Sequence, residues 1–279
     1  MSITRLSSTV VLTLALAVAL GTTASGNHSW GPYHWARQQS EFTLTVVNST
    51  TNGWGSYVAN ALSDWSQSRV VDLVPVAGST SSRDRRQCRP PAGQVRICNL
   101  EYGYNGWLGI AGISVDQDGH ILYGYTKLND SYFNSGFYNN GAWKQSVTCQ
   151  ELGHDLGLDH QDEDFNNETL ETCMDYQNPP WQFPNAHDYA QLETIYGHLD
   201  DYDSYETAGA GGDPGGGEEG GGTCNAPPGK GCNKGTVGQS NEPYGWGISL
   251  GRRGPHETFI RIEPDGTRHI THVTWAEIQ

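Results

Sequence analysis

Positive charge is scarce in this sequence. The 279 residues include 16 Lys and Arg against 31 Asp and Glu, and the formal net charge is -15. A nucleic-acid partner would need a basic face for its phosphate groups, so the charge balance argues against nucleic-acid binding.

Long apolar runs are also absent, with one short exception near the start. Residues 10–20 are almost entirely apolar, follow Arg5 and precede the small polar residues GTTASG. The run is too short to span a bilayer, and this order is typical of a secretory signal peptide. We therefore expect residues 1–26 to be a signal peptide. The mature chain should be secreted, monomeric and without a membrane anchor.

Cysteines number only six, and no two of them form a C-x-x-C pair. A cysteine–zinc site usually contains such pairs, so it is the weaker of two interpretations. In an exported chain, the six cysteines instead indicate three disulfides, because the thiols meet an oxidising medium. Other connectivities remain open, but proximity along the chain favours three pairs: Cys88 with Cys98, Cys149 with Cys173, and Cys224 with Cys232.

A glycine-rich stretch divides the chain. Residues 207–223 read TAGAGGDPGGGEEGGGT, which can bury little apolar surface and predicts a flexible acidic linker. We expect a main domain over residues 27–206 and a small β-rich module over residues 224–279. Near the end of this module, FIRIEPDGTRHITHVTW contains two alternating runs about a Pro-Asp-Gly turn, which predicts a β-hairpin.

The main domain should be of the α/β (α+β) class. Residues 41–48 alternate like a half-buried strand, residues 54–65 have helical apolar spacing, and residues 70–77 return to strand character. Two strands over 107–116 and 120–130 should meet at a tight turn at Asp118-Gly119. Helices should follow over 142–156 and from 185 onward, where Asn185 is a candidate N-cap.

Residues 149–160, CQELGHDLGLDH, carry the candidate chemistry. Residues four apart on a helix face the same way, so Gln150 and His154 should project side by side, with Glu151 on the same rim. Gly157 can adopt the left-handed conformation that ends a helix, which lets His160 return toward the same point. Gln150, His154 and His160 would then converge.

The spacing E-x-x-H-x-x-G-x-x-H, followed by CMDY, resembles the metzincin superfamily of zinc endopeptidases. The resemblance covers about residues 30–200. It implies a twisted mixed sheet with an antiparallel edge strand, a motif helix, a Met-turn and a C-terminal helix. It also implies a polypeptide substrate that adds to an edge strand within residues 107–128.

Carried onto this sequence, the resemblance makes His154 and His160 zinc ligands. Glu151 becomes the general base for a metal-activated water that hydrolyses peptide bonds. Met174 would form the floor of the site. Tyr176 would approach the metal or steady the tetrahedral intermediate.

The sequence departs from the family at Gln150, where the motif has histidine. A carboxamide oxygen is a weaker zinc donor than an imidazole. Either Gln150 still binds the metal, or Tyr176, His120 or Asp162 completes the shell, or the site holds little metal. The main hypothesis is a secreted zinc endopeptidase. The alternative is a catalytically weak or inactive extracellular binding protein with a metzincin-like fold.

Other polar residues are weaker candidates. His187 and His198 should be structural or exposed, and His269 and His272 should be surface or core side chains because their spacing matches no ligand pattern. Acidic stretches at residues 116–119, 159–168 and 199–206 offer oxygen ligands for calcium, but none matches an EF-hand loop. Solvated acidic loops are the simpler interpretation.

Overall fold

The computed structural model describes residues 28–51, 53–134, 136–205 and 245–276. The predicted signal peptide, the glycine-rich linker and the Cys224–Cys232 pair lie outside these residues. The described residues form an eight-stranded sheet in the order β2-β1-β3-β5-β4-β8-β7-β6. The strands are β1 (Phe42–Ser49), β2 (Val71–Ala77), β3 (Val95–Leu100), β4 (Trp107–Val115), β5 (Ile121–Asn129), β6 (Ile248–Arg253), β7 (His256–Ile262) and β8 (Arg268–Trp275).

The sheet is mixed, as the sequence predicts. Pairing is parallel from β2 through β1 and β3 to β5, and antiparallel from β5 through β4, β8 and β7 to β6. The predicted turn between β4 and β5 is present, with Gly119 at a φ of 99°. The predicted C-terminal hairpin is present as β7 and β8.

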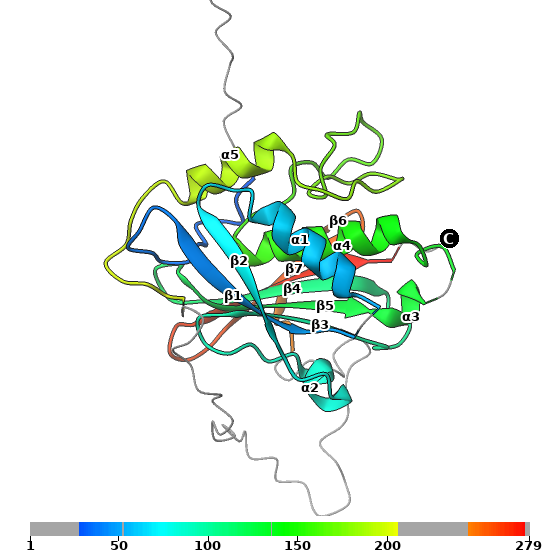
Figure 1. Ribbon diagram of the computed structural model, residues 1–279, viewed down its shortest axis with the longest axis horizontal. Coiled ribbons are helices and arrows are strands. Elements are labelled where there is room, and N and C mark those ends of the chain that lie inside the picture. Colours follow the sequence, from blue (N-terminus) through cyan, green and yellow to red (C-terminus); the bar gives the residue numbers. More distant parts are fainter. Residues whose placement is uncertain (1–27, 52, 135, 206–244, 277–279) are drawn as a thin grey trace, which may run out of the picture.

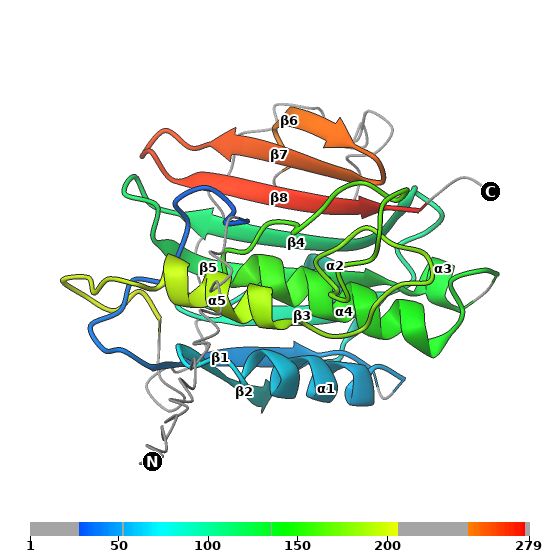
Figure 2. The same ribbon diagram turned by 90° about the horizontal axis from the view of Figure 1, so that it is seen from above.

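The expected antiparallel edge strand is not at an edge. β4 is antiparallel to β5, but its other side pairs with β8, and every residue of β4 is buried. Figure 2 shows β8, β7 and β6 continuing the sheet beyond β4. The prediction was wrong because the C-terminal hairpin supplies the main-chain partners that an edge strand would lack. The described part of the C-terminal region is thus built into the main sheet.

Three helices cover one face of the sheet: α1 (Gly55–Trp65), α4 (Gly141–Asp155) and α5 (Ala186–Ile195). In Figure 1 these helices lie on one side of the sheet, and the short α2 (Ser82–Gln87) lies on the other; α3 (Asp130–Phe133) follows β5. α5 is capped by Asn185, whose side chain accepts hydrogen bonds from the backbone N–H groups of His187 and Asp188 in a capping box. No helix within the described ranges combines the length and apolar character needed to cross a membrane.

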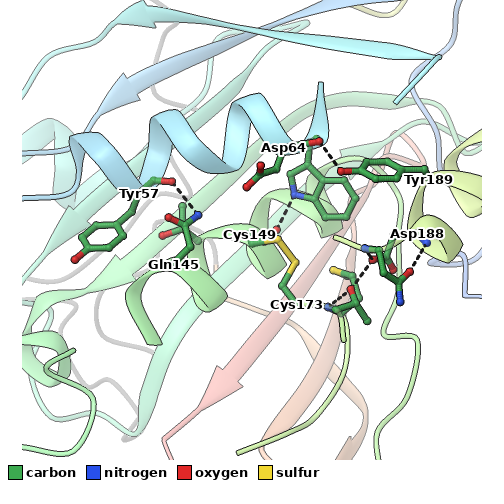
Figure 3. Close-up of a disulfide and its surroundings, with 12 residues drawn as sticks. Tyr57, Asp64, Gln145, Cys149, Cys173, Asp188 and Tyr189 are labelled. Atoms are coloured by element: carbon green, nitrogen blue, oxygen red, sulfur yellow. Dashed lines mark hydrogen bonds between the residues drawn. A yellow bond between two sulfur atoms is a disulfide. The ribbon is translucent and has the colours of Figure 1, made fainter. Parts of the chain in front are cut away.

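Aromatic side chains join the helices, and a disulfide joins α4 to the segment that contains Met174. The predicted bonds Cys88–Cys98 and Cys149–Cys173 are both present. Figure 3 shows Cys149 of α4 joined to Cys173, and Tyr189 of α5 donating to the carbonyl oxygen of Asp64 at 2.8 Å. The indole of Trp65, fully buried, donates to the carbonyl oxygen of Cys149 at 2.9 Å. α4 is therefore held against α1 and the segment that contains Met174, and α5 is held against α1.

Candidate metal centre

The end of α4 turns the chain back on itself, as the sequence predicts. Gly157 has a φ of 92°, and a Cβ there would collide with the carbonyl oxygen of Tyr33, so both backbone conformation and space require glycine. The turn returns His160 to His154, with 4.7 Å between the ring centroids. Both imidazoles are buried.

The two rings are oriented so that one nitrogen of each lacks a partner. Nδ1 of His154 donates to the carbonyl oxygen of Leu158 at 2.8 Å, and Nδ1 of His160 lies 2.9 Å from the hydroxyl of Tyr176. Nε2 of each ring is buried and makes no hydrogen bond. Buried polar atoms are almost always satisfied, so this pair of nitrogens fits a bound cation.

A third imidazole comes from β8. The ring of His272 lies 4.1 Å from that of His154 and 4.6 Å from that of His160, centroid to centroid. One ring nitrogen from each of the three histidines lies within 4.8 Å of the others. His272 was expected only as a surface or core side chain, and it is indeed buried, but at the candidate site.

His256 of β7 adjoins this cluster. Its Nδ1 lies 3.0 Å from Nε2 of His272, and its ring stacks on Tyr176 with 3.9 Å between centroids. His256 was not among the predicted site residues. For β8 the sequence did contain a signal: the alternation of side chains along a strand places His272 and Thr274 on the same face.

Thr274 connects β8 to the two polar residues that precede His154 on α4. Its hydroxyl lies 2.6 Å from Oε1 of Glu151 and 3.2 Å from Oε1 of Gln150. The other carboxyl oxygen of Glu151, Oε2, is buried and makes no hydrogen bond. Gln150 therefore lies at the site, with its carboxamide oxygen against Thr274.

Burial sets the protonation of the cluster. It raises the pKa of Glu151 well above the usual range, and it lowers the pKa of His154 to about 3, with nearby His160 adding to the effect. Burial also lowers the pKa of His272 well below the usual value. Burial acts in the same direction on His160, but bonds to Asp159 and Glu163 outweigh it and leave the pKa raised. Neutral imidazoles are the form that binds a metal.

Met174 and Tyr176 lie beside the cluster, in different positions. Met174 is fully buried beneath α4, and a Cβ on Gly153 would lie 2.8 Å from its sulfur. The Tyr176 hydroxyl contacts Nδ1 of His160, the nitrogen opposite the unpartnered Nε2. Tyr176 thus supports the ring of His160 from behind.

The other groups considered for the metal shell have different partners. His120 belongs to a separate group with His34 and Asp200. Asp162 accepts from the backbone N–H of Asp164 and from the side chain of Asn167 within its own loop.

Calcium gains no support from the acidic turn at residues 116–119. Oδ1 of Asp116 accepts the backbone N–H groups of Asp118, Gly119 and His120, each at 2.9 Å. This carboxylate therefore has a structural role in the turn between β4 and β5.

A surface hollow opens beside the cluster. It is lined by His256 and His272, by the charged side chains of Asp159, Glu163, Arg253 and Glu257, and by Trp30, Leu250, Gly251 and Thr258. A second hollow reaches Gln150, Tyr176 and Thr274 from the other side of His256. The buried imidazoles are thus approached by two depressions of the surface.

No protein-family model and no curated protein matches the sequence. Among solved structures, a similar chain is high choriolytic enzyme 1, a hatching enzyme zinc-protease from Oryzias latipes, the medaka fish. The sequence identity is 11%, the alignment covers 59% of this chain and 94% of that chain, and the TM-score is 0.34. A similarity this low carries no argument about function.

Proposed function

We propose that this protein is a secreted zinc-dependent endopeptidase in which His154, His160 and His272 hold the metal and Glu151 is the general base. The observation that carries the proposal is the pair of buried, unpartnered Nε2 atoms of His154 and His160 beside a third imidazole. The imidazole of His272 takes the role that the motif alone assigned to Gln150.

The donor set fits zinc. Three imidazole nitrogens are typical zinc ligands, and three protein ligands leave the fourth tetrahedral position for water or substrate. Zinc bound there would act as a Lewis acid and lower the pKa of a water molecule toward neutrality.

In this proposal Glu151 moves the proton. Its Oε1 is held by the hydroxyl of Thr274, whereas Oε2 is free to accept a hydrogen. In the proposed reaction Glu151 takes a proton from the attacking water, the water oxygen bonds to the peptide carbonyl carbon, and the C–N bond breaks. Glu151 then delivers the proton to the leaving nitrogen. Its raised pKa suits a group that must both accept and return a proton near neutral pH.

A polypeptide is the substrate class that best suits the surroundings. β8 is itself an extended strand that pairs with β4 and lies against Glu151 through Thr274. β8 thus occupies the position beside α4 that an extended chain would take. The hollow lined by His256 and His272 offers a route to the same cluster for a chain that comes from outside.

One observation favours the second candidate, a catalytically weak or inactive extracellular binding protein. β4 is paired on both sides, and Glu151 is fully buried with Thr274 on one oxygen. If β8 never leaves β4, a peptide cannot pair with β4 beside Glu151. The protein would then bind metal without cleaving peptides.

Metal analysis combined with peptide cleavage separates the two. The full-length secreted protein, loaded with zinc, should cleave fluorescently labelled casein, lose this activity with 1,10-phenanthroline and regain it when zinc is restored. His154→Ala should give neither activity nor restoration. Stoichiometric zinc at the α4 site without cleavage would overturn the endopeptidase and leave the binding protein.

A further inference from the structure

A second group of candidate metal-binding side chains lies near the turn between β4 and β5. It consists of His34, which precedes β1, His120, which precedes β5, and His198 and Asp200, which follow α5. Nε2 of each histidine lies 3.5 Å from Oδ1 of Asp200. Nε2 of His34 and Nε2 of His198 are 3.1 Å apart. His34, His120 and Asp200 each place one donor atom within 4.8 Å of the others, and Nε2 of His198 lies beside His34 and Asp200.

The hydrogen bonds behind the rings direct Nε2 of His34 and Nε2 of His120 toward Asp200. Nδ1 of His34 faces the carbonyl oxygen of Pro32 at 2.9 Å, and Nδ1 of His120 faces a carboxyl oxygen of Asp116 at 3.1 Å. Pro32 and Asp116 offer acceptors, and the Tyr202 hydroxyl, which donates to Asp116, also lies 2.9 Å from Nδ1 of His120. A hydrogen on Nδ1 satisfies these contacts, and the neutral ring then presents a lone pair at Nε2. Two lone pairs then face the carboxyl oxygen of Asp200, which is an electrostatically unfavourable arrangement.

Protonation of all three rings is no better a solution. Three imidazolium ions would then crowd one carboxylate, with two of their nitrogens only 3.1 Å apart. One divalent cation at the centre would accept all the nitrogen lone pairs and the carboxylate oxygen at once.

The separations match a zinc shell. Zinc binds imidazole nitrogen and carboxylate oxygen at about 2.0–2.2 Å, so tetrahedral ligands lie about 3.3–3.6 Å from one another. The three nitrogen–oxygen separations of 3.5 Å fall in this range, and the His34–His198 nitrogen separation of 3.1 Å is slightly shorter. The donors of His34, His120 and Asp200 lie within 4.8 Å of one another.

The surrounding bonds orient the donors. Metal-bound histidines usually donate their other N–H to a carbonyl or carboxylate, as His34 does to Pro32 and His120 to Asp116. Asp200 is oriented similarly, because its Oδ2 accepts the backbone N–H of Arg37 at 2.9 Å. Oδ1 of Asp200 remains for the cation.

We propose that His34, His120, His198 and Asp200 bind a second zinc ion with a structural role. Four protein ligands fill a tetrahedral shell and leave no position for a substrate. The ion would join the segment before β1, the turn between β4 and β5, and the segment after α5. Its binding would therefore stabilise the packing of these three segments independently of any peptidase activity.

Zinc stoichiometry of the full-length protein tests the proposal. The wild-type chain should bind two zinc ions, and His198→Ala should bind one. His198 suits this test because its side chain is 53% exposed, so its loss should not prevent folding. His269→Ala is the matched control, since this histidine belongs to neither metal group, and it should retain two ions.

Variants at the α4 site make the result independent of the proposed function. In a chain with His154→Ala and His272→Ala, one zinc ion should remain, and adding His198→Ala should remove it. Cobalt in the remaining site should give the intense visible absorption of tetrahedral coordination. If the zinc content of the α4-site variant is unchanged by His198→Ala, the second site is refuted, whether or not the wild type cleaves peptides.

Discussion

The ring centroids of His154 and His272 lie 4.1 Å apart, although His154 belongs to α4 and His272 to β8, the last strand in chain order. Strand pairing produces this proximity. Ala111 of β4 is the partner of His272 in β8, and Gly109 of β4 lies against Glu151 of α4 without room for a Cβ. The candidate metal centre therefore depends on the docking of the C-terminal strands onto β4.

Replacing His272 should weaken zinc binding at the α4 site far more than replacing Gln150. Loss of groups outside the ligand shell already costs about 10–100-fold in metal affinity, so loss of a ligand should cost about 100-fold or more. His272→Ala should show this loss, whereas Gln150→Ala should change the affinity only slightly. The measurement is a competition titration with a chelating dye in a His198→Ala background. The reverse order of effects would make Gln150 the ligand.

Glu151→Gln should abolish cleavage and keep zinc. General base catalysis contributes about 10²–10⁴-fold, so kcat should fall by that factor when the carboxylate becomes an amide. Glu101→Gln is the control. Glu101 is exposed, lies 50 residues before Glu151 in the sequence, and accepts a hydrogen bond from the side chain of Asn134. Casein cleavage and zinc content of both variants are compared. Activity that survives in Glu151→Gln would remove this residue from the mechanism.

Local patterns predicted much of the main domain. The spacing of Val58, Leu62 and Trp65 gave the buried face of α1, and the capping signal at Asn185 gave the start of α5. Gly157 also acted as expected, because the requirement for positive φ is a property of the residue itself. These features depend on neighbours within a few residues, and the sequence displays such neighbours directly.

Long-range pairing was not accessible in the same way. Alternation predicted the β7–β8 hairpin, but nothing in it specifies that β8 would pair with β4 and bring His272 to α4. The second histidine group has the same origin, since His34, His120 and His198 come from three separate segments. The strand order and the third metal ligand therefore required the tertiary structure.

Gly157→Ala should destabilise the fold and loosen the metal centre. The substitution combines a positive φ with a collision against the carbonyl oxygen of Tyr33. Gly103→Ala is the matched control, because Gly103 has a φ of 96° but nothing within 4 Å of an added Cβ. Gly103→Ala should cost about 1 kcal/mol of unfolding free energy and Gly157→Ala about 2–3 kcal/mol or more. Guanidinium unfolding followed by tryptophan fluorescence measures both unfolding free energies. Equal decreases for the two variants would show that the backbone at Tyr33 moves aside without an energetic cost.

The two described disulfides should differ in their effect on zinc binding. Removal of either bond, by Cys149→Ala with Cys173→Ala or by Cys88→Ala with Cys98→Ala, should cost about 3 kcal/mol of unfolding free energy. The sequence separations are 10 and 24 residues, and the closure entropy depends only logarithmically on loop length. Only the first bond joins α4 to the segment of Met174 beneath the metal centre. Zinc affinity at the α4 site should therefore fall when this bond is removed and stay near wild type when the other is removed. Dye competition under conditions where both variants remain folded measures the difference, and equal affinities would mean that packing alone positions α4.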